Sequence, residues 1–267
     1  MGRPQYRAAI RYEVMVNYFD NTDYSVIVVG AGRGIGRAAA LELVAHGVGV
    51  ACLDSDGDNA AKVAEELKAK GGRAFAGKLD VADPAGIAPA IEKAAASLGR
   101  VDALVNCAGI TGRTNVPAHE VDPEDFDLVY RVNLRGAFLL SKAVLPHMIK
   151  RKYGRMLHVA SIAGKDGNAG MTAYSATKAG LIGMVKSMAK DYVTQGITIN
   201  ALAPAVVRTA MVDALPQATV DYMTAKIPMG RCGELQECAE MIAWTVSPAC
   251  SFTTGFTFDL SGGRATY

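Results

Sequence analysis

"YSVIVVGAGRGIGRAAALELVAHG", residues 24–47, joins a short apolar run to a glycine-rich turn and then to an amphipathic segment. The apolar run at 24–30 predicts a buried strand, and residues 34–47 predict a helix that ends near Gly47. The turn between them contains Gly30, Gly32, Gly34 and Gly36. Such glycines let the backbone approach a pyrophosphate, and the following helix N-terminus offers free N–H groups to it. The order strand, glycine turn, helix therefore predicts a dinucleotide-binding unit.

Apolar runs and amphipathic stretches alternate along the rest of the chain. Further strands are expected at residues 48–54, 73–81, 101–109, 154–161, 196–204 and 253–263, and helices at 58–72, from Pro84, at 123–150 and at 172–194. Nearly continuous apolar strands that alternate with helices predict a parallel sheet covered on both faces. We therefore expect an α/β doubly wound fold (Rossmann fold), whose ligands bind beyond the carboxyl ends of the strands.

The length of 267 residues suits one domain. We expect an N-terminal extension at 1–22 and a single Rossmann-type domain at 23–267. The longest irregular stretch, 204–233, contains three prolines and predicts a substrate lid after strand six. The extension has no continuous apolar segment, so no secretory signal is expected. No other run approaches the roughly 18 apolar residues of a membrane span, so a soluble protein is expected.

Composition argues against several partners. The 28 basic and 26 acidic residues give a net charge of +2 without a basic cluster, so neither nucleic acid nor a membrane surface is an expected partner. The five cysteines lack C-x-x-C spacing and the four histidines are scattered, so no metal site is expected. Thiols that are reduced and buried in the core indicate a cytoplasmic protein. With nucleic acid, membrane and metal not expected, a small-molecule substrate is the expected ligand.

Asp54 ends the second expected strand and bears on the choice of cofactor. A carboxylate there accepts hydrogen bonds from the adenosine ribose and repels a 2′-phosphate, which favours NAD over NADP. Arg33, inside the glycine turn, has the opposite tendency because a guanidinium pairs with phosphate. An unscreened contact between like charges outweighs a mobile surface arginine, so NAD is the predicted cofactor.

Two other strand ends offer groups to a dinucleotide. Asp80 and Val81 end strand three, where a carboxylate and a backbone N–H would meet the adenine edge, although Asp80 equally suits a helix N-cap or a turn. "NCAG" after strand four would place Asn106, Ala108 and Gly109 against the cofactor. Asn106 also suits a purely structural turn.

Tyr174 and Lys178 in "AYSATKAG" lie four residues apart, so on a helix their side chains project from the same face. A free tyrosine has a pKa of about 10, and lowering it to near 7 requires about 4 kcal/mol of preference for the phenolate. A neighbouring ammonium in a desolvated cleft can supply much of this preference. The pair is therefore a candidate general acid/base, and an exposed helix pair is the alternative.

Two more polar residues are placed to assist. Ser161 follows strand five, thirteen residues before Tyr174, where its hydroxyl would hold a substrate oxygen. Asn133 lies inside the expected helix 123–150, where it would bind a water and disturb the helix locally. The alternatives are a helix cap for Ser161 and a solvated position for Asn133.

The chain resembles the short-chain dehydrogenase/reductase family over about residues 23–263. The resemblance rests on six features in this order: "GAGRGIG", "NCAG", Asn133, Ser161, "YSATK" and "PAVVRT". The resemblance implies that Tyr174 is the acid/base and that Lys178 lowers its pKa and binds the nicotinamide ribose. It also implies that Ser161 polarises the carbonyl and that Asn133 holds a relay water. The cofactor contacts implied by glycine turn, strand ends and family pattern are Gly30, Arg33, Gly34, Ile35, Gly36, Asp54, Asp80, Val81, Asn106, Ala108, Gly109, Tyr174, Lys178, Pro204, Val207 and Thr209.

The chain departs from the family pattern at Val29, Cys107 and Ala205, and none of these changes removes a group needed for hydride transfer. "FDLSGGRATY" and "SIAGKDGNAGMTAY" look like NAD-dependent members that oxidise secondary alcohols of polyols or sugar acids. The cation for a substrate carboxylate would be Arg264, Lys165 or Arg113, although a solvated surface position suits each one better.

Two other functions stay open. One is a 3-oxoacyl-(acyl carrier protein) reductase that uses NADPH, but only Lys152 matches a basic docking position, and the other position is Gln195. The second is a dinucleotide-sensing module without catalysis, which would usually lack the tyrosine or the lysine.

In the family, helices matching 123–150 and 172–194 form subunit interfaces, so a homotetramer is expected. Core packing is the alternative for their apolar residues, Leu181, Met184, Val185 and Met188.

Overall fold

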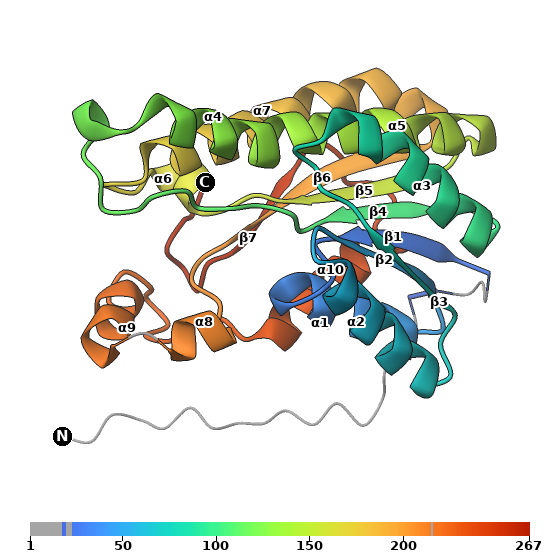
Figure 1. Cartoon of the computed structure of the whole chain (residues 1–267), viewed down its shortest axis with the longest axis horizontal. Helices are drawn as coiled ribbons and strands as arrows, with labels where there is room; N and C mark the ends of the chain where they lie inside the picture. The colour runs from blue at the N-terminus through green and yellow to red at the C-terminus, as the bar shows by residue number, and fades with distance from the viewer. Residues whose placement is uncertain (1–17, 20–22, 215) are drawn as a thin grey trace.

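A computed structural model of the chain describes residues 18–19, 23–214 and 216–267. Its centre is a sheet of seven parallel strands in the order β3-β2-β1-β4-β5-β6-β7 (Figure 1). The strands are β1 Ser25–Val29, β2 Gly49–Asp54, β3 Ala74–Lys78, β4 Ala103–Asn106, β5 Gly154–Val159, β6 Ile197–Pro204 and β7 Thr257–Leu260. The prediction of a single-domain doubly wound parallel sheet is confirmed. Chain order reverses between β1 and β4, so a crevice is expected at their carboxyl ends.

Helices cover both faces of the sheet (Figure 1). One face carries α3 Pro84–Leu98, α5 Gly136–Arg151 and α7 Thr172–Tyr192, and the other carries α1 Gly34–Ala45, α2 Gly57–Ala69 and α10 Leu235–Thr245. Successive residues of β1 point to opposite faces. Ile27 therefore joins the core under α3, α5 and α7, while Val26 and Val28 join the core under α1 and α10.

The single helix predicted for 123–150 is wrong. The segment consists of α4 Pro123–Tyr130, the π-helical turn η2 Arg131–Arg135, and α5. The expected local disturbance at Asn133 is confirmed, because this residue lies in the middle of the π-helical turn. A π-type turn widens the helix at one point, and such turns are frequent at functional sites.

The stretch 204–233 is less irregular than predicted, since it contains α8 Ala210–Asp213 and α9 Gln217–Thr224. Its two ends meet: Gly233 N–H donates to the Val206 carbonyl at 2.9 Å, and Arg208 N–H donates to the Gly233 carbonyl at 2.7 Å. We call residues 206–233 the lid. Helix α10, which follows it, was not among the predicted helices. Figure 1 places α8 and α9 at the same end of the sheet as α6 Ala163–Asp166 and the C-terminus.

Short 3-10 turns, η1 Ala118–Glu120 and η3 Val193–Gln195, complete the elements. The predicted extension at 1–22 lies outside the described residues apart from Tyr18 and Phe19, of which Phe19 is buried. Within the described ranges, every helix is too short or too polar to cross a membrane.

Candidate active site

The glycine turn after β1 is shaped by two close backbone approaches. A Cβ on Gly30 would lie 2.8 Å from the Ala108 nitrogen, and a Cβ on Gly36 would overlap the Gly30 carbonyl oxygen. Gly30 also has a φ of +76°, which favours glycine. The turn therefore needs glycine at these two positions for its path between β1, α1 and the loop after β4.

The start of α1 is open to a ligand. Its N-cap residue, the exposed Arg33, makes no side-chain cap, and the space beside Gly34 is empty to 4 Å. Free N–H groups and the positive end of the helix dipole are thus available to an anion. Asp54 lies beneath the turn, where its Oδ2 accepts from Gly32 N–H at 2.8 Å and its Oδ1 from Asp56 N–H at 3.0 Å. These features fit the diphosphate and ribose of a dinucleotide.

The end of β3 fits the cofactor role less directly. Asp80 is exposed and its Oδ1 accepts from Ala82 N–H at 2.8 Å, so it is a turn acid, while Asp83 caps α3. The Val81 side chain is buried in the core beside Gly136. Only the backbone of Val81 and the second oxygen of Asp80 are therefore candidates for contact with an adenine.

Asn106 is a structural residue as well as a neighbour of the site. It is 2% exposed, and its Oδ1 accepts from Ala108 N–H at 3.1 Å, which shapes the loop that carries Gly109. Its Nδ2 donates to His158 Nδ1 at 3.3 Å. Because the Ser141 hydroxyl donates to the Ala137 carbonyl, its oxygen accepts from His158 Nε2, which sets the tautomer of the ring.

His158 was missed in the sequence, where the only signal is a histidine inside the apolar strand "GRMLHVAS". The ring is fully buried, and burial lowers its pKa to about 4, with a smaller effect from the charge of Lys178. His158 is therefore neutral near pH 7 and supports Asn106 by hydrogen bonding, not by charge.

Ser161, Tyr174 and Lys178 meet at one cavity of about 260 Å³ beyond the carboxyl ends of β4, β5 and β6. Ser161 and Tyr174 share a side-chain hydrogen bond. The Lys178 ammonium lies 5.7 Å from the centre of the Tyr174 ring and donates to the Val159 carbonyl at 2.6 Å. Lys178 is 4% exposed, so the alternative of an exposed helix pair is excluded.

Burial dominates the titration of both residues. It raises the pKa of Tyr174 above its usual value, while the hydrogen bond with Ser161 lowers it. It lowers the pKa of Lys178 to about 8. The prediction that Lys178 brings the pKa of Tyr174 towards 7 is therefore wrong for the polypeptide by itself, because removal of the phenol from water outweighs the neighbouring groups.

Asn133 is also buried, at 1% exposure, so its solvated alternative is excluded. Its Oδ1 accepts from Ile110 N–H at 2.8 Å, and its Nδ2 donates to the Ile110 carbonyl at 2.8 Å and to Thr177 Oγ1 at 3.2 Å. A Cβ on Gly109 would lie 3.3 Å from both Asn133 Oδ1 and Lys178 Nζ. The π-helical turn, the loop after β4 and α7 thus meet at Gly109.

The structure brings a group of the predicted site residues to the cavity itself: Ile35, Gly109, Ser161, Tyr174, Lys178, Pro204, Val207 and Thr209. Thr209 Oγ1 also accepts from Val212 N–H at 3.4 Å and so caps α8 of the lid. The others lie in the glycine turn, at the ends of the strands and in the π-helical turn: Gly30, Arg33, Gly34, Gly36, Asp54, Asp80, Val81, Asn106, Ala108 and Asn133. Among the described residues, no group of three His, Cys, Asp or Glu side chains could hold a metal ion.

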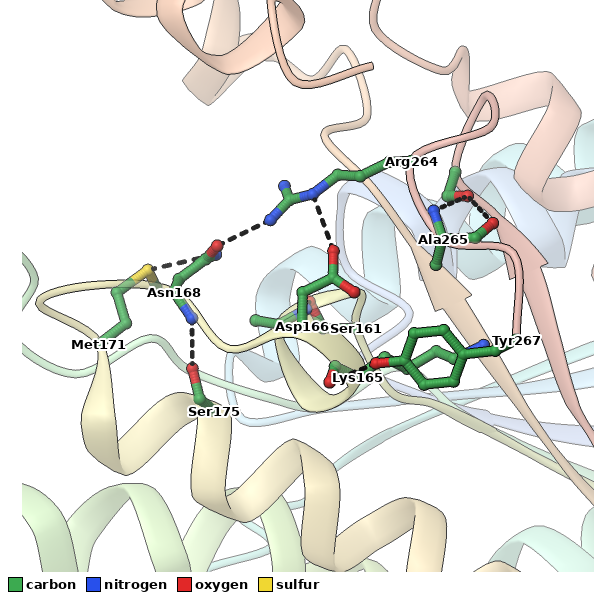
Figure 2. Close-up of polar contacts among 11 residues, drawn as sticks. Ser161, Lys165, Asp166, Asn168, Met171, Ser175, Arg264, Ala265 and Tyr267 are labelled. Atoms are coloured by element: carbon green, nitrogen blue, oxygen red, sulfur yellow. Dashed lines mark hydrogen bonds and ion pairs between the residues drawn. The ribbon is translucent and has the colours of Figure 1, made fainter. Parts of the chain in front are cut away.

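The three cations considered for a substrate carboxylate differ in their surroundings. Lys165 pairs with Asp259 at 2.8 Å, and its side chain is 9% exposed. Arg264 pairs with Asp166 at 3.3 Å, as Figure 2 shows, and its side chain is 10% exposed. The prediction that these two are solvated is therefore wrong. Arg113 is exposed.

Comparison with known proteins agrees with this geometry. A family model described as short chain dehydrogenase matches residues 24–219. The chain is 45% identical over 241 residues to 2-dehydro-3-deoxy-L-rhamnonate dehydrogenase (NAD(+)) of Sphingomonas sp. (strain SKA58), covering 90% of this chain and 95% of that protein. It is 41% identical over 237 residues to the 3-oxoacyl-(acyl-carrier-protein) reductase FabG of Salmonella typhimurium, covering 89% and 95%. The crystal structure of gox2181 superposes with a TM-score of 0.87 at 30% identity, covering 90% and 95%.

Proposed function

The chain belongs to the short-chain dehydrogenase family and is an oxidoreductase for CH–OH groups, and from this premise we propose that it interconverts a secondary alcohol and a ketone with NAD. We propose a small hydroxylated substrate, such as a sugar acid or a polyol. One observation carries the chemistry: a single cavity next to the glycine turn is lined by Ser161, Tyr174 and Lys178.

Each of these residues has a task in the proposed reaction. The Ser161 hydroxyl holds the substrate oxygen, and Tyr174 takes the alcohol proton as a phenolate or, as a phenol, returns a proton to the ketone oxygen. The bound nicotinamide supplies the hydride acceptor. With a pKa of about 8, Lys178 is mostly charged at pH 7, so its ammonium favours the phenolate when the cavity is closed to water. We assign binding of the nicotinamide ribose to the same ammonium.

Asn133 supports this arrangement from the π-helical turn. It holds both backbone groups of Ile110, which lines the cavity, and so fixes one wall of it. We also assign to Asn133 the relay water that connects Lys178 with solvent, because the two side chains approach the same point beside Gly109.

Asp54 supports NAD as the cofactor. Its carboxylate lies at the end of β2 and is held under the glycine turn by Gly32 N–H, where a 2′-phosphate would meet its negative charge. The Sphingomonas relative, whose name includes NAD(+), is consistent with this preference.

The relatives leave a second substrate class to be tested, because FabG proteins are 36–41% identical to this chain. The docking position at Lys152 is exposed, but Gln195 replaces the second basic residue, which supports the small polar substrate. A chain that only senses dinucleotides would be expected to lack the Tyr174 and Lys178 pair.

We also propose a homotetramer. Its interface would be formed by other residues than those of the helix 172–194 that the sequence suggested. Leu181, Val185 and Met188 are buried in the chain's own core, which confirms the alternative of core packing for these three. The pair α4 and α5 instead exposes large apolar side chains: Phe126, Leu128, Tyr130, Phe138 and Ile149. Such a surface suits burial against another subunit, and sedimentation velocity measures the outcome.

A substrate panel tests the function. Purified protein is mixed with sugar acids, polyols or acyl thioesters, each with NAD(H) and NADP(H), and the nicotinamide absorbance is followed. We expect turnover of a sugar acid or polyol with NAD, and loss of turnover in Tyr174→Phe. Tyr153→Phe is the matched control, because that hydroxyl bonds Tyr24 at the other end of β5. Equal turnover by Tyr174→Phe and wild type would refute the chemistry, and turnover of acyl thioesters alone would refute the substrate class.

A further inference from the structure

The residues after β7 hold the segment that carries the candidate catalytic groups. We call residues 261–267 the C-terminal tail, and Figure 2 shows its contacts. Arg264 Nη2 donates to Asn168 Oδ1 at 2.8 Å, and Arg264 Nε donates to Asp166 Oδ2 at 3.3 Å. The Tyr267 hydroxyl donates to the Lys165 carbonyl at 2.7 Å. The tail therefore binds three nearby residues of one short segment.

That segment joins Ser161 to Tyr174. Asn168 lies between Gly167 and Gly170, whose φ values are +72° and +71°, so the backbone on both sides of it adopts conformations that only glycine adopts freely. The Asn168 backbone N–H donates to Ser175 Oγ at 3.1 Å, next to Tyr174. The position of Asn168 is thus coupled by a hydrogen bond to the first turn of α7.

The tail is itself fixed to the base of the lid. Met229 N–H donates to the Gly262 carbonyl at 3.1 Å. A Cβ on Gly262 would lie 2.6 Å from an Ile227 methyl group, and one on Gly263 would lie 3.3 Å from Pro228.

Arg264 makes two of the tail's contacts with the segment. Its side chain is only 10% exposed, and its guanidinium donates to both a carboxylate and an amide, which a planar fork of donors does well. Its charge is already matched by Asp166, so a role in holding the segment fits its surroundings better than a role as a free cation for substrate.

We propose that Arg264 is a positioning residue for the reaction: through Asp166 and Asn168 it fixes the segment that sets Ser161 against Tyr174, and the tail that carries Arg264 is itself bonded to the lid. This inference rests on the proposed function. Small misplacements of reacting groups cost large factors in rate, so loss of this tie should lower turnover without removing any reacting group.

The test is Arg264→Gln in the full-length chain, with the alcohol that wild type turns over. We expect kcat to fall about tenfold or more, while KM for NAD is unchanged. Because the hydrogen bond with Ser161 lowers the pKa of Tyr174, a looser pair should also move the alkaline rise of the kcat–pH profile to higher pH. Arg264→Lys, which still pairs with Asp166, should recover part of kcat.

The matched control is Arg37→Gln, which removes a bidentate pair with Glu66 between α1 and α2 and should change neither kcat nor the pH profile. A second variant, Asp166→Asn, removes the ion pair alone and should shift kcat in the same direction as Arg264→Gln. NADH binding and thermal unfolding report whether each variant is folded. Wild-type kcat and pH profile in folded Arg264→Gln would overturn the positioning role, whereas an inactive wild type would overturn the proposed function instead.

Discussion

Replacing Asn133 by alanine tests whether the π-helical turn holds the cavity wall. The Asn133 side chain makes three hydrogen bonds, two to the backbone of Ile110 at 2.8 Å and one to Thr177 at 3.2 Å. All three are lost in Asn133→Ala, and no other residue of the turn can replace them in the same geometry. The loop after β4 would then lose its hydrogen bonds at Ile110, while the contact of Asn106 with Ala108 and that of Cys107 N–H with the Val29 carbonyl remain.

The expected loss of stability follows from this count. A net contribution of about 1 kcal/mol for each hydrogen bond gives about 3 kcal/mol for the side chain. For a domain of this size, that corresponds to a fall in Tm of about 6–10 °C. Since Ile110 lines the cavity, kcat should fall as well, whereas NAD binding through the glycine turn should persist.

Thermal unfolding by circular dichroism and NADH turnover measure the two effects. Asn59→Ala is the control, because its exposed amide makes one 2.8 Å bond to Asp56 and its loss should change stability by only about 0.5 kcal/mol. Asn133→Asp keeps the acceptor for Ile110 N–H but loses both donors. We therefore expect its free energy of unfolding to be lower than that of wild type. A loss under about 1 kcal/mol for Asn133→Ala, with normal turnover, would refute the role given to this side chain.

Two further predictions concern charge. Burial lowers the pKa of Lys178 from 10.5 to about 8, so between these pH values the unfolded state binds more protons at this residue. The stability of wild type relative to Lys178→Met should therefore rise by about 3 kcal/mol across that window, and Lys178→Met should lose turnover. The same pH dependence of thermal unfolding in both proteins would contradict this. Asp54→Ser removes the carboxylate beneath the glycine turn, so the NADP to NAD ratio of kcat/KM should increase on the order of 100-fold, while an unchanged ratio would show that Asp54 does not set the preference.

Local pattern was sufficient to predict the parts of the fold that depend on neighbours in sequence. The apolar run, glycine turn and helix at 24–47 each have a periodicity or a residue type that dictates their conformation, and the structure contains all three. The meeting of Tyr174 and Lys178 follows from helical spacing alone. Helix α10 could also have been predicted from the sequence, because Glu234 and Glu237 form a capping box at its start.

The remaining features depend on partners far along the chain. The π-helical turn forms where Asn133 bonds Ile110, 23 residues away, and Arg264 reaches Asn168 across 96 residues. No periodicity encodes either pair. The direction of the pKa shift at Tyr174 was predicted wrongly for a related reason: burial of the phenol is a property of the folded cavity, and it outweighs any effect that the spacing of two residues suggests.

The two ends of the sheet differ in how their buried charged side chains are paired, and this difference bears on function. At the amino end, Asp102 is fully buried but pairs with Arg100 at 2.6 Å and accepts from Ser25 N–H at 2.9 Å. At the carboxyl end, Lys178 is buried against a backbone carbonyl, and desolvation lowers its pKa. A buried ammonium without a carboxylate beside it destabilises the fold, since burial penalises its charged form. Its place in the cavity with Tyr174 and Ser161 is therefore not explained by stability, and it supports the proposed role in proton transfer.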